Sequence, residues 1–138
     1  MIAYLDTSAV VKLLVDEPGS DTAERVWLAA DARVCATVGR VEATAALGRA
    51  GRAGRLSAAG VRRGITDLAQ LWGSLHRMVV DDELASAAAD LALTHELRGY
   101  DAVHLAAAIA SADTFVAADQ RLLAAAHAAG LAVADVAA

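Results

Sequence analysis

The sequence predicts an α/β protein: a three-layer α/β/α sandwich with a mostly parallel central sheet of four or five strands. The length of 138 residues suits one domain with one hydrophobic core, and no linker divides residues 1–138. Hydrophobic residues make up 57% of the chain but aromatic residues only 4%, so the core must pack through Ala, Leu and Val. Short apolar runs alternate with longer helical segments, which is typical of a parallel sheet covered by helices on both faces.

Five short apolar runs are the candidate strands. They cover residues 1–5, 33–36, 78–80, 115–117 and 131–133. Each is too short for a helix and is flanked by polar or turn residues, which favours a buried strand. The last run has the weakest pattern, so a sheet of four strands is the alternative.

The segments between these runs have apolar residues at helical spacing. We expect helices over residues 9–15, 21–30, 38–50, 58–75, 82–97, 102–110 and 120–129. Hydroxyl side chains precede three of them and can accept a hydrogen bond from a first-turn N–H group: Thr7 or Ser8, Thr37, and Ser57. Turns are expected at 17–20 and 98–100, where Pro or Gly interrupts the pattern.

The charge pattern is uneven. A net charge of −5 argues mildly against a nucleic-acid-binding protein. Eleven of the twelve basic residues are nevertheless Arg, whose planar guanidinium suits phosphate, and six of these lie close together in the sequence. The six are Arg40, Arg49, Arg52, Arg55, Arg62 and Arg63. This stretch is either a nucleic-acid surface or a solvated helical face.

Membrane and disulfide signals are weak. The longest weakly polar stretch, residues 102–112, is interrupted by His104 and is shorter than the ~20 residues that span a bilayer. The N-terminus shows no pattern of a secretory signal. Cys35 is the only cysteine, which excludes an internal disulfide and fits a reduced, cytoplasmic location.

Four acidic residues lie where the predicted sheet would place a ligand. Asp6 directly follows the first apolar run and Asp119 follows the fourth. Glu42 lies about one turn into the helix after the second strand, and Asp101 heads an Ala-rich helix. Ligands of open α/β sheets bind beyond the carboxyl ends of the strands, so we expect these carboxylates at one edge.

Repulsion between these carboxylates would destabilise the fold unless a cation neutralised their charge. Two unit charges ~4 Å apart repel by ~4 kcal/mol at an effective dielectric near 20, and a whole domain is stable by only ~5–15 kcal/mol. Oxygen ligands select hard ions such as Mg²⁺ or Mn²⁺, and no His/Cys spacing suggests zinc. Such a site suits phosphodiester hydrolysis. The alternative is that Asp6 and Asp101 cap helices, Asp119 lies in a turn and Glu42 is a surface residue.

Four segments in order resemble the motifs of PIN-domain proteins of the VapC toxin type. They are YLDTSAVVKL at residues 4–13, Glu42 after ATV at 36–38, RGYDAVHLA at 98–106 and FVAADQRL at 115–122. GRLS at 54–57 also resembles that family's mid-chain turn. Each motif is weak alone, but together they cover essentially the whole chain.

The resemblance implies a Mg²⁺- or Mn²⁺-dependent endoribonuclease toxin that is neutralised by a VapB-type antitoxin and forms a homodimer. In it Asp6, Glu42 and Asp101 would bind the metal, and Asp119 would bind it directly or act through water on a second ion. Ser8 would orient Asp6 or a nearby water. The attacking group would be a metal-activated water. The family often has Thr or Ser where this chain has Ala117, which leaves the role of Asp119 open.

Other functions and roles stay open at this stage. A PIN-fold RNA-processing nuclease without a toxin role and a non-catalytic binding module both fit. A phosphatase with Asp6 as nucleophile is weaker, because Ser8 stands where that chemistry usually has a second Asp. We interpret His104 as a packing or surface residue rather than a catalytic base, and Trp27 and Trp72 as core residues. If RNA is bound, we expect Arg40, Arg49 and Arg52 to contact it.

Overall fold

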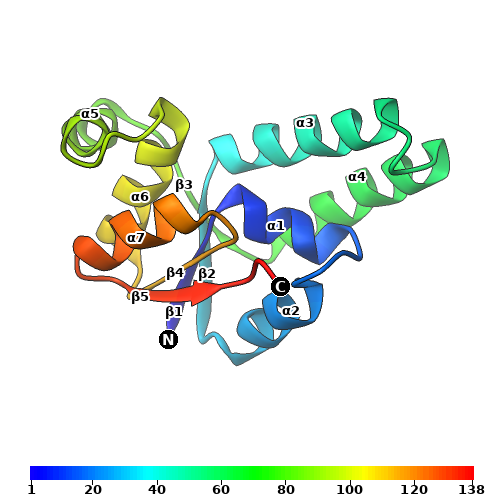
Figure 1. The fold of residues 1–138 in the computed structure, drawn as a ribbon, viewed down its shortest axis with the longest axis horizontal. Helices are drawn as coiled ribbons and strands as arrows, with labels where there is room; N and C mark the ends of the chain where they lie inside the picture. The colour runs from blue at the N-terminus through cyan, green and yellow to red at the C-terminus, as the bar shows by residue number, and fades with distance from the viewer.

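The computed structural model describes residues 1–138 and contains one five-stranded sheet. The strands are β1 (Ile2–Leu5), β2 (Ala32–Ala36), β3 (His76–Met78), β4 (Thr114–Ala117) and β5 (Ala132–Asp135). They lie in the order β3-β2-β1-β4-β5, and every neighbouring pair is parallel. The predicted α/β sandwich is therefore confirmed, with five strands rather than four (Figure 1).

Seven helices cover the two faces of this sheet. They are α1 (Thr7–Leu14), α2 (Ser20–Ala29), α3 (Val38–Arg52), α4 (Ala58–Gly73), α5 (Asp82–His95), α6 (Gly99–Ser111) and α7 (Gln120–Ala128). Helices α5, α6 and α7 pack on one face and α1 to α4 on the other; the α3–α4 hairpin extends to one side in Figure 1. No helix is long and apolar enough to cross a membrane.

Strand β1 lies at the centre and divides the core. Its side chains alternate, so Tyr4 packs in the cluster with α5, α6 and α7, whereas Ala3 and Leu5 pack in the cluster with α1, α2 and α4. Tyr4 is in register with Val34 of β2 and Phe115 of β4. Because the strands are parallel, β1, β2 and β4 all end at the same edge, which is where the candidate site lies.

Several predicted element boundaries were wrong, and those at β3 and α6 have a clear structural cause. β3 runs from His76 to Met78 rather than over 78–80, because Ala36 of β2 pairs with Met78 and the valines beyond it extend past the ladder; Val79 is 71% exposed. Helix α6 begins at Gly99 rather than at Ala102. Arg98, in extended conformation, is its N-cap, so residues 99 and 100 belong to the helix instead of a turn.

The caps were predicted with mixed success. Ser57 caps α4, and its hydroxyl accepts a hydrogen bond from the N–H of Gly60. Thr37 lies before α3 but makes no capping bond, because its backbone is already helical. α1 is capped by Asp6 and not by Thr7 or Ser8, so this site residue also satisfies the helix terminus.

Candidate active site

Asp6 is fixed at the carboxyl end of β1. Its backbone N–H donates to the carbonyl of Val116 at 3.0 Å, which ties it to β4. Its Oδ2 accepts hydrogen bonds from the N–H of Ser8 at 3.2 Å and from the Ser8 hydroxyl at 2.6 Å. The same hydroxyl accepts from the N–H of Ala118 at 3.0 Å. Ser8 therefore connects Asp6 to the end of β4, and Oδ1 of Asp6 accepts no hydrogen bond from the protein.

Glu42 points back from α3 toward the same edge. Both of its hydrogen bonds go to Oε1: the hydroxyl of Thr7 donates at 2.8 Å, and Nε2 of His104 lies at 2.5 Å. The Oε2 atom accepts no hydrogen bond from the protein. As at Asp6, the protein holds one carboxylate oxygen and leaves the second unpaired.

His104 lies at the centre of these contacts. It is 1% exposed, with Nδ1 at 2.6 Å from the hydroxyl of Tyr4 and Nε2 at 3.9 Å from Oδ1 of Asp6. The expectation of a packing or surface role missed this polar network, and Thr7 and Tyr4 were also missed. The available signal was that His104 is the one polar residue in the apolar stretch 102–110, three positions after Asp101.

Asp101 and Asp119 meet in a cavity of about 270 Å³. Asp101 lies in the first turn of α6, with Nε of Arg98 at 3.5 Å. Asp119 is the N-cap of α7, and its Oδ1 accepts from the N–H of Leu122 at 3.2 Å. The alternative of a capping role is confirmed for Asp6 but is wrong for Asp101, because Arg98 is the N-cap of α6; Asp119, expected in a turn, caps α7 instead. Capping engages only one carboxylate oxygen of Asp6 and one of Asp119.

The pKa values show that negative charge accumulates here. Burial raises the pKa of Asp101, and the charges of Asp6 and Asp119 raise it further against the opposing effect of Arg98. Burial also acts to raise the pKa of Glu42, but the hydrogen bonds to His104 and Thr7 and the charges of His104 and Arg49 together outweigh burial, so the net pKa is lowered. For His104, burial lowers the pKa, and Glu42 and Asp6 outweigh burial and raise it.

The donor set suits a hard divalent cation. Asp6, Glu42 and Asp119 each keep one oxygen unpaired, and Asp101 faces two other negative charges. No three of the His, Cys, Asp and Glu side chains lie close enough together to hold an ion as they stand. Carboxylates without a cation between them repel, so a shared ion requires these side chains to turn toward one another.

The six clustered arginines lie on α3 and α4 and on the turn between them. All six are exposed, and none forms an ion pair. Arg49 lies two turns beyond Glu42 on the same helix, and its charge helps to lower the pKa of Glu42. The hairpin therefore presents unpaired positive charge that begins near the carboxylates.

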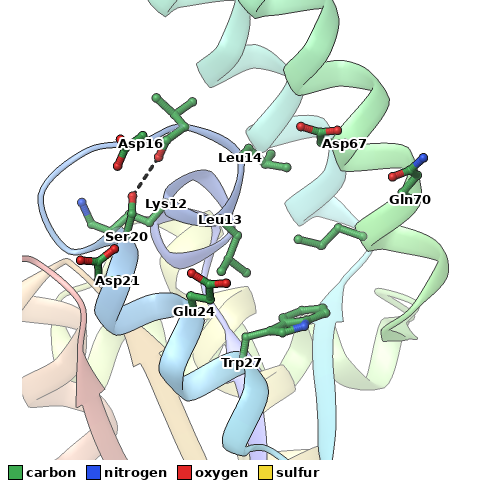
Figure 2. Close-up of a pocket in the computed structure, with 12 residues that line it drawn as sticks. Lys12, Leu13, Leu14, Asp16, Ser20, Asp21, Glu24, Trp27, Asp67 and Gln70 are labelled. Atoms are coloured by element: carbon green, nitrogen blue, oxygen red, sulfur yellow. Dashed lines mark hydrogen bonds between the residues drawn. The ribbon is translucent and has the colours of Figure 1, made fainter.

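A larger cavity of about 510 Å³ lies between α1, α2 and α4 (Figure 2), and its lining includes none of Asp6, Glu42, Asp101 and Asp119. Its apolar lining comes from Leu13, Leu14, Val15, Trp27 and Leu71. Four acidic residues also line it, Asp16, Asp21, Glu24 and Asp67, and none of them is in an ion pair. Its one basic residue, Lys12, is already bound to Glu17 and to the carbonyl of Pro18.

A family model described as the PIN domain matches residues 3–128, so the chain belongs to the PIN-domain family. It is similar to Ribonuclease VapC45 and Ribonuclease VapC49 of Mycobacterium tuberculosis strains CDC 1551 and H37Rv. Each is 37% identical over 136 residues, which is 96% of this chain and 94% of the relative.

Solved structures share the fold. PAE2754 from Pyrobaculum aerophilum has a TM-score of 0.73 at 21% identity, and the match covers 99% of this chain and 85% of the PAE2754 chain. VapC20 of M. tuberculosis, described as a Sarcin-Ricin loop cleaving toxin, has a TM-score of 0.71 at 18% identity. The match covers 94% of this chain and 95% of the VapC20 chain. VapBC2 from Rickettsia felis, bound to a DNA fragment from its promoter, has a TM-score of 0.71 at 15% identity, with 98% of each chain covered.

Proposed function

We propose that the chain is a Mg²⁺- or Mn²⁺-dependent endoribonuclease toxin of the VapC type. The observation that carries the proposal is the set of four carboxylates, Asp6, Glu42, Asp101 and Asp119, around the ends of β1 and β4; the first, second and fourth keep an oxygen without a hydrogen bond. The raised pKa of Asp101 supports it, because burial and then the charges of Asp6 and Asp119 disfavour the carboxylate form, which a cation would stabilise. The names of the relatives point to the same activity.

Each residue has a distinct role in this proposal. A bound divalent ion supplies a nucleophile at neutral pH and stabilises charge on the phosphate. Asp6, Glu42, Asp101 and Asp119 would hold it, and Ser8 keeps Asp6 oriented. Arg40, Arg49 and Arg52 would bind the RNA phosphates beside the cleaved bond.

An Asp101→Asn variant tests the site directly. We expect the purified chain to cleave RNA with Mg²⁺ and to stop when the metal is chelated. Asp101→Asn should lower the rate by roughly 100-fold or more, the scale of losing one group that stabilises transition-state charge. Asp90→Asn is the matched control, because Asp90 is exposed on α5 and should keep full activity. Equal rates for the two variants would refute the assignment of Asp101.

Growth on expression separates a toxin from an RNA-processing enzyme. If the chain is a toxin, its expression without a partner arrests growth, and Asp6→Asn or Asp101→Asn restores growth. Normal growth with the active chain, together with cleavage of RNA in vitro, would favour the processing enzyme.

We further propose that a VapB-type antitoxin binds in the 510 Å³ cavity between α1, α2 and α4. Its apolar floor with four unpaired carboxylates fits a partner segment that carries an apolar side chain flanked by Lys or Arg. A toxin–antitoxin complex from Klebsiella pneumoniae and VapBC2 from Rickettsia felis share this fold, which motivates the choice of partner.

Charge reversal tests this partner surface. We expect the product of a neighbouring small reading frame to co-purify with the wild-type chain but not with a Glu24→Lys/Asp67→Lys variant. An Asp90→Lys variant, altered on the opposite layer, should still co-purify. If the double variant retains the partner, the antitoxin binds elsewhere. The family resemblance also implies a homodimer, which remains a prediction. Sedimentation velocity would measure the oligomeric state of the purified chain.

A further inference from the structure

The imidazole of His104 is enclosed by protein and uses both of its nitrogens. The side chain is 1% exposed, and a buried polar group is costly unless it is hydrogen-bonded. Nδ1 faces the hydroxyl of Tyr4 at 2.6 Å, and Nε2 faces Oε1 of Glu42 at 2.5 Å. Both partners come from distant parts of the chain: Tyr4 from β1 and Glu42 from α3.

The neighbours of Tyr4 determine where the imidazole hydrogen lies. The Tyr4 oxygen accepts a hydrogen bond from the N–H of Ala36 at 3.0 Å, at the end of β2. Tyr4 can therefore direct its own hydroxyl hydrogen at Nδ1 of His104, which then acts as the acceptor. The ring hydrogen is left on Nε2, where Glu42 accepts it. If Nδ1 also carries a hydrogen, as in the charged imidazolium, Nε2 still donates its own hydrogen to Glu42.

This donor selects one carboxylate oxygen of Glu42. His104 and the hydroxyl of Thr7 both donate to Oε1, so Oε2 is the oxygen left for a cation. We propose that His104, with its hydrogen placed by Tyr4, is a positioning residue that fixes the orientation of the Glu42 carboxylate. The inference rests on the proposed metal-dependent function and adds to it a buried chain of hydrogen bonds from β2 to α3.

A catalytic role for His104 itself does not fit this geometry. A general base must come within about 3 Å of the proton that it abstracts, and here both nitrogens are occupied by protein groups in a side chain that water does not reach. Groups that orient a metal ligand through a hydrogen bond typically change metal affinity by about 10- to 100-fold when removed. Metal affinity is therefore the sensitive readout.

Mn²⁺ binding measured by calorimetry tests the proposal. We expect His104→Leu to weaken Mn²⁺ binding by about 10- to 100-fold. His104→Gln, whose amide can still donate to Glu42, should restore part of the affinity. Leu131→Ala is the control for general destabilisation, because Leu131 is buried in the hydrophobic cluster that contains Tyr4 but directly precedes β5, at the opposite edge of the sheet. This control should bind Mn²⁺ like the wild type.

Nitrogen-15 NMR of the metal-free wild-type chain and of a Tyr4→Phe variant tests the hydrogen placement. We expect Nε2 of His104 to carry a hydrogen, and Tyr4→Phe to disturb this state. An unprotonated Nε2, or wild-type Mn²⁺ affinity in His104→Leu, would overturn the positioning role. If the wild-type chain binds no Mn²⁺ at all, the proposed metal-dependent function fails instead, so the two failures are distinguishable.

Discussion

Single side chains decide which oxygen atoms the carboxylates present at the edge of the sheet. Ser8 takes one oxygen of Asp6, Thr7 and His104 take one oxygen of Glu42, and the N–H of Leu122 takes one oxygen of Asp119. Three carboxylates are thus each held on one side and free on the other. Orientation by neighbouring hydrogen bonds is how proteins prepare ligands for a cation before it binds.

The Cys35 thiol gives a residue-scale prediction that is independent of activity. It is fully buried at β2, and burial raises the pKa of the thiol well above its ordinary value, with the charges of Asp6 and Glu42 adding to the shift. Because the thiolate is the reactive form, native protein should label with a thiol reagent far more slowly than protein unfolded in guanidinium. Raising the pH from about 7 to 9 should leave the native rate near zero. Rapid stoichiometric labelling of the folded chain contradicts the burial of Cys35.

The individual residues were predictable to different degrees. Asp6 and Asp119 follow apolar runs directly, so local sequence was enough to predict their place at the carboxyl edge. The partners of His104 were not predictable in this way, because Glu42 lies 62 positions and Tyr4 100 positions away along the chain. Only the packed sheet brings these three together, and a single sequence contains no pattern for such a contact.

At the scale of elements, the helices and strands follow from apolar periodicity, and the errors fall at their ends. The β3 boundary was wrong because Val79 and Val80 are apolar residues typical of strands, whereas the ladder with β2 ends at Met78. The start of α6 was wrong because Gly99 and Tyr100 resemble a turn. Pairing and capping, which involve other parts of the chain, decide such boundaries.

At Gly39, helix α3 packs too closely on β2 to leave room for a side chain. A Cβ atom at Gly39 would overlap the buried sulfur of Cys35, so Gly39→Ala should reduce the free energy of unfolding by about 1–3 kcal/mol. Gly73, at the end of α4, has no heavy atom within 4 Å of a Cβ, and Gly73→Ala should be neutral or stabilising by about 0.5–1 kcal/mol. Urea unfolding measures both. Equal stability of the two variants would mean that α3 does not pack as closely on β2 as described.

The α3–α4 hairpin gives a second prediction at this scale. If its arginines bind RNA phosphates, an Arg49→Ala/Arg52→Ala variant should bind RNA more weakly and flatten the salt dependence by about 0.7 per lost contact. The measurement is best made in the Asp101→Asn background, so that the RNA is not cleaved. Arg25→Ala, on α2, is the control and should leave the slope unchanged. An unchanged slope in the double variant argues that the hairpin is only a solvated surface.

At the scale of the whole molecule, the parallel sheet brings the candidate site residues together at one edge. Its strand order places β1 between β2 and β4, so that Asp6, Asp119 and the start of α3 meet at one edge. The Ala-rich composition lets the helices approach closely. The acidic cavity between α1, α2 and α4 (Figure 2) is lined by none of the four candidate site carboxylates. Substrate and neutralising partner would therefore use different surfaces.

The ends of the RNA fragments test the central claim most directly. If carboxylates holding a divalent cation direct water at the phosphodiester, cleavage by the purified chain with Mg²⁺ leaves a 5′-phosphate and a 3′-hydroxyl. A 2′-deoxy substitution at the cleaved position should then cause little loss of rate. Mass spectrometry of the fragments reads the result. A 2′,3′-cyclic phosphate, with cleavage lost on 2′-deoxy substitution, would show that the ribose hydroxyl attacks and would contradict the account.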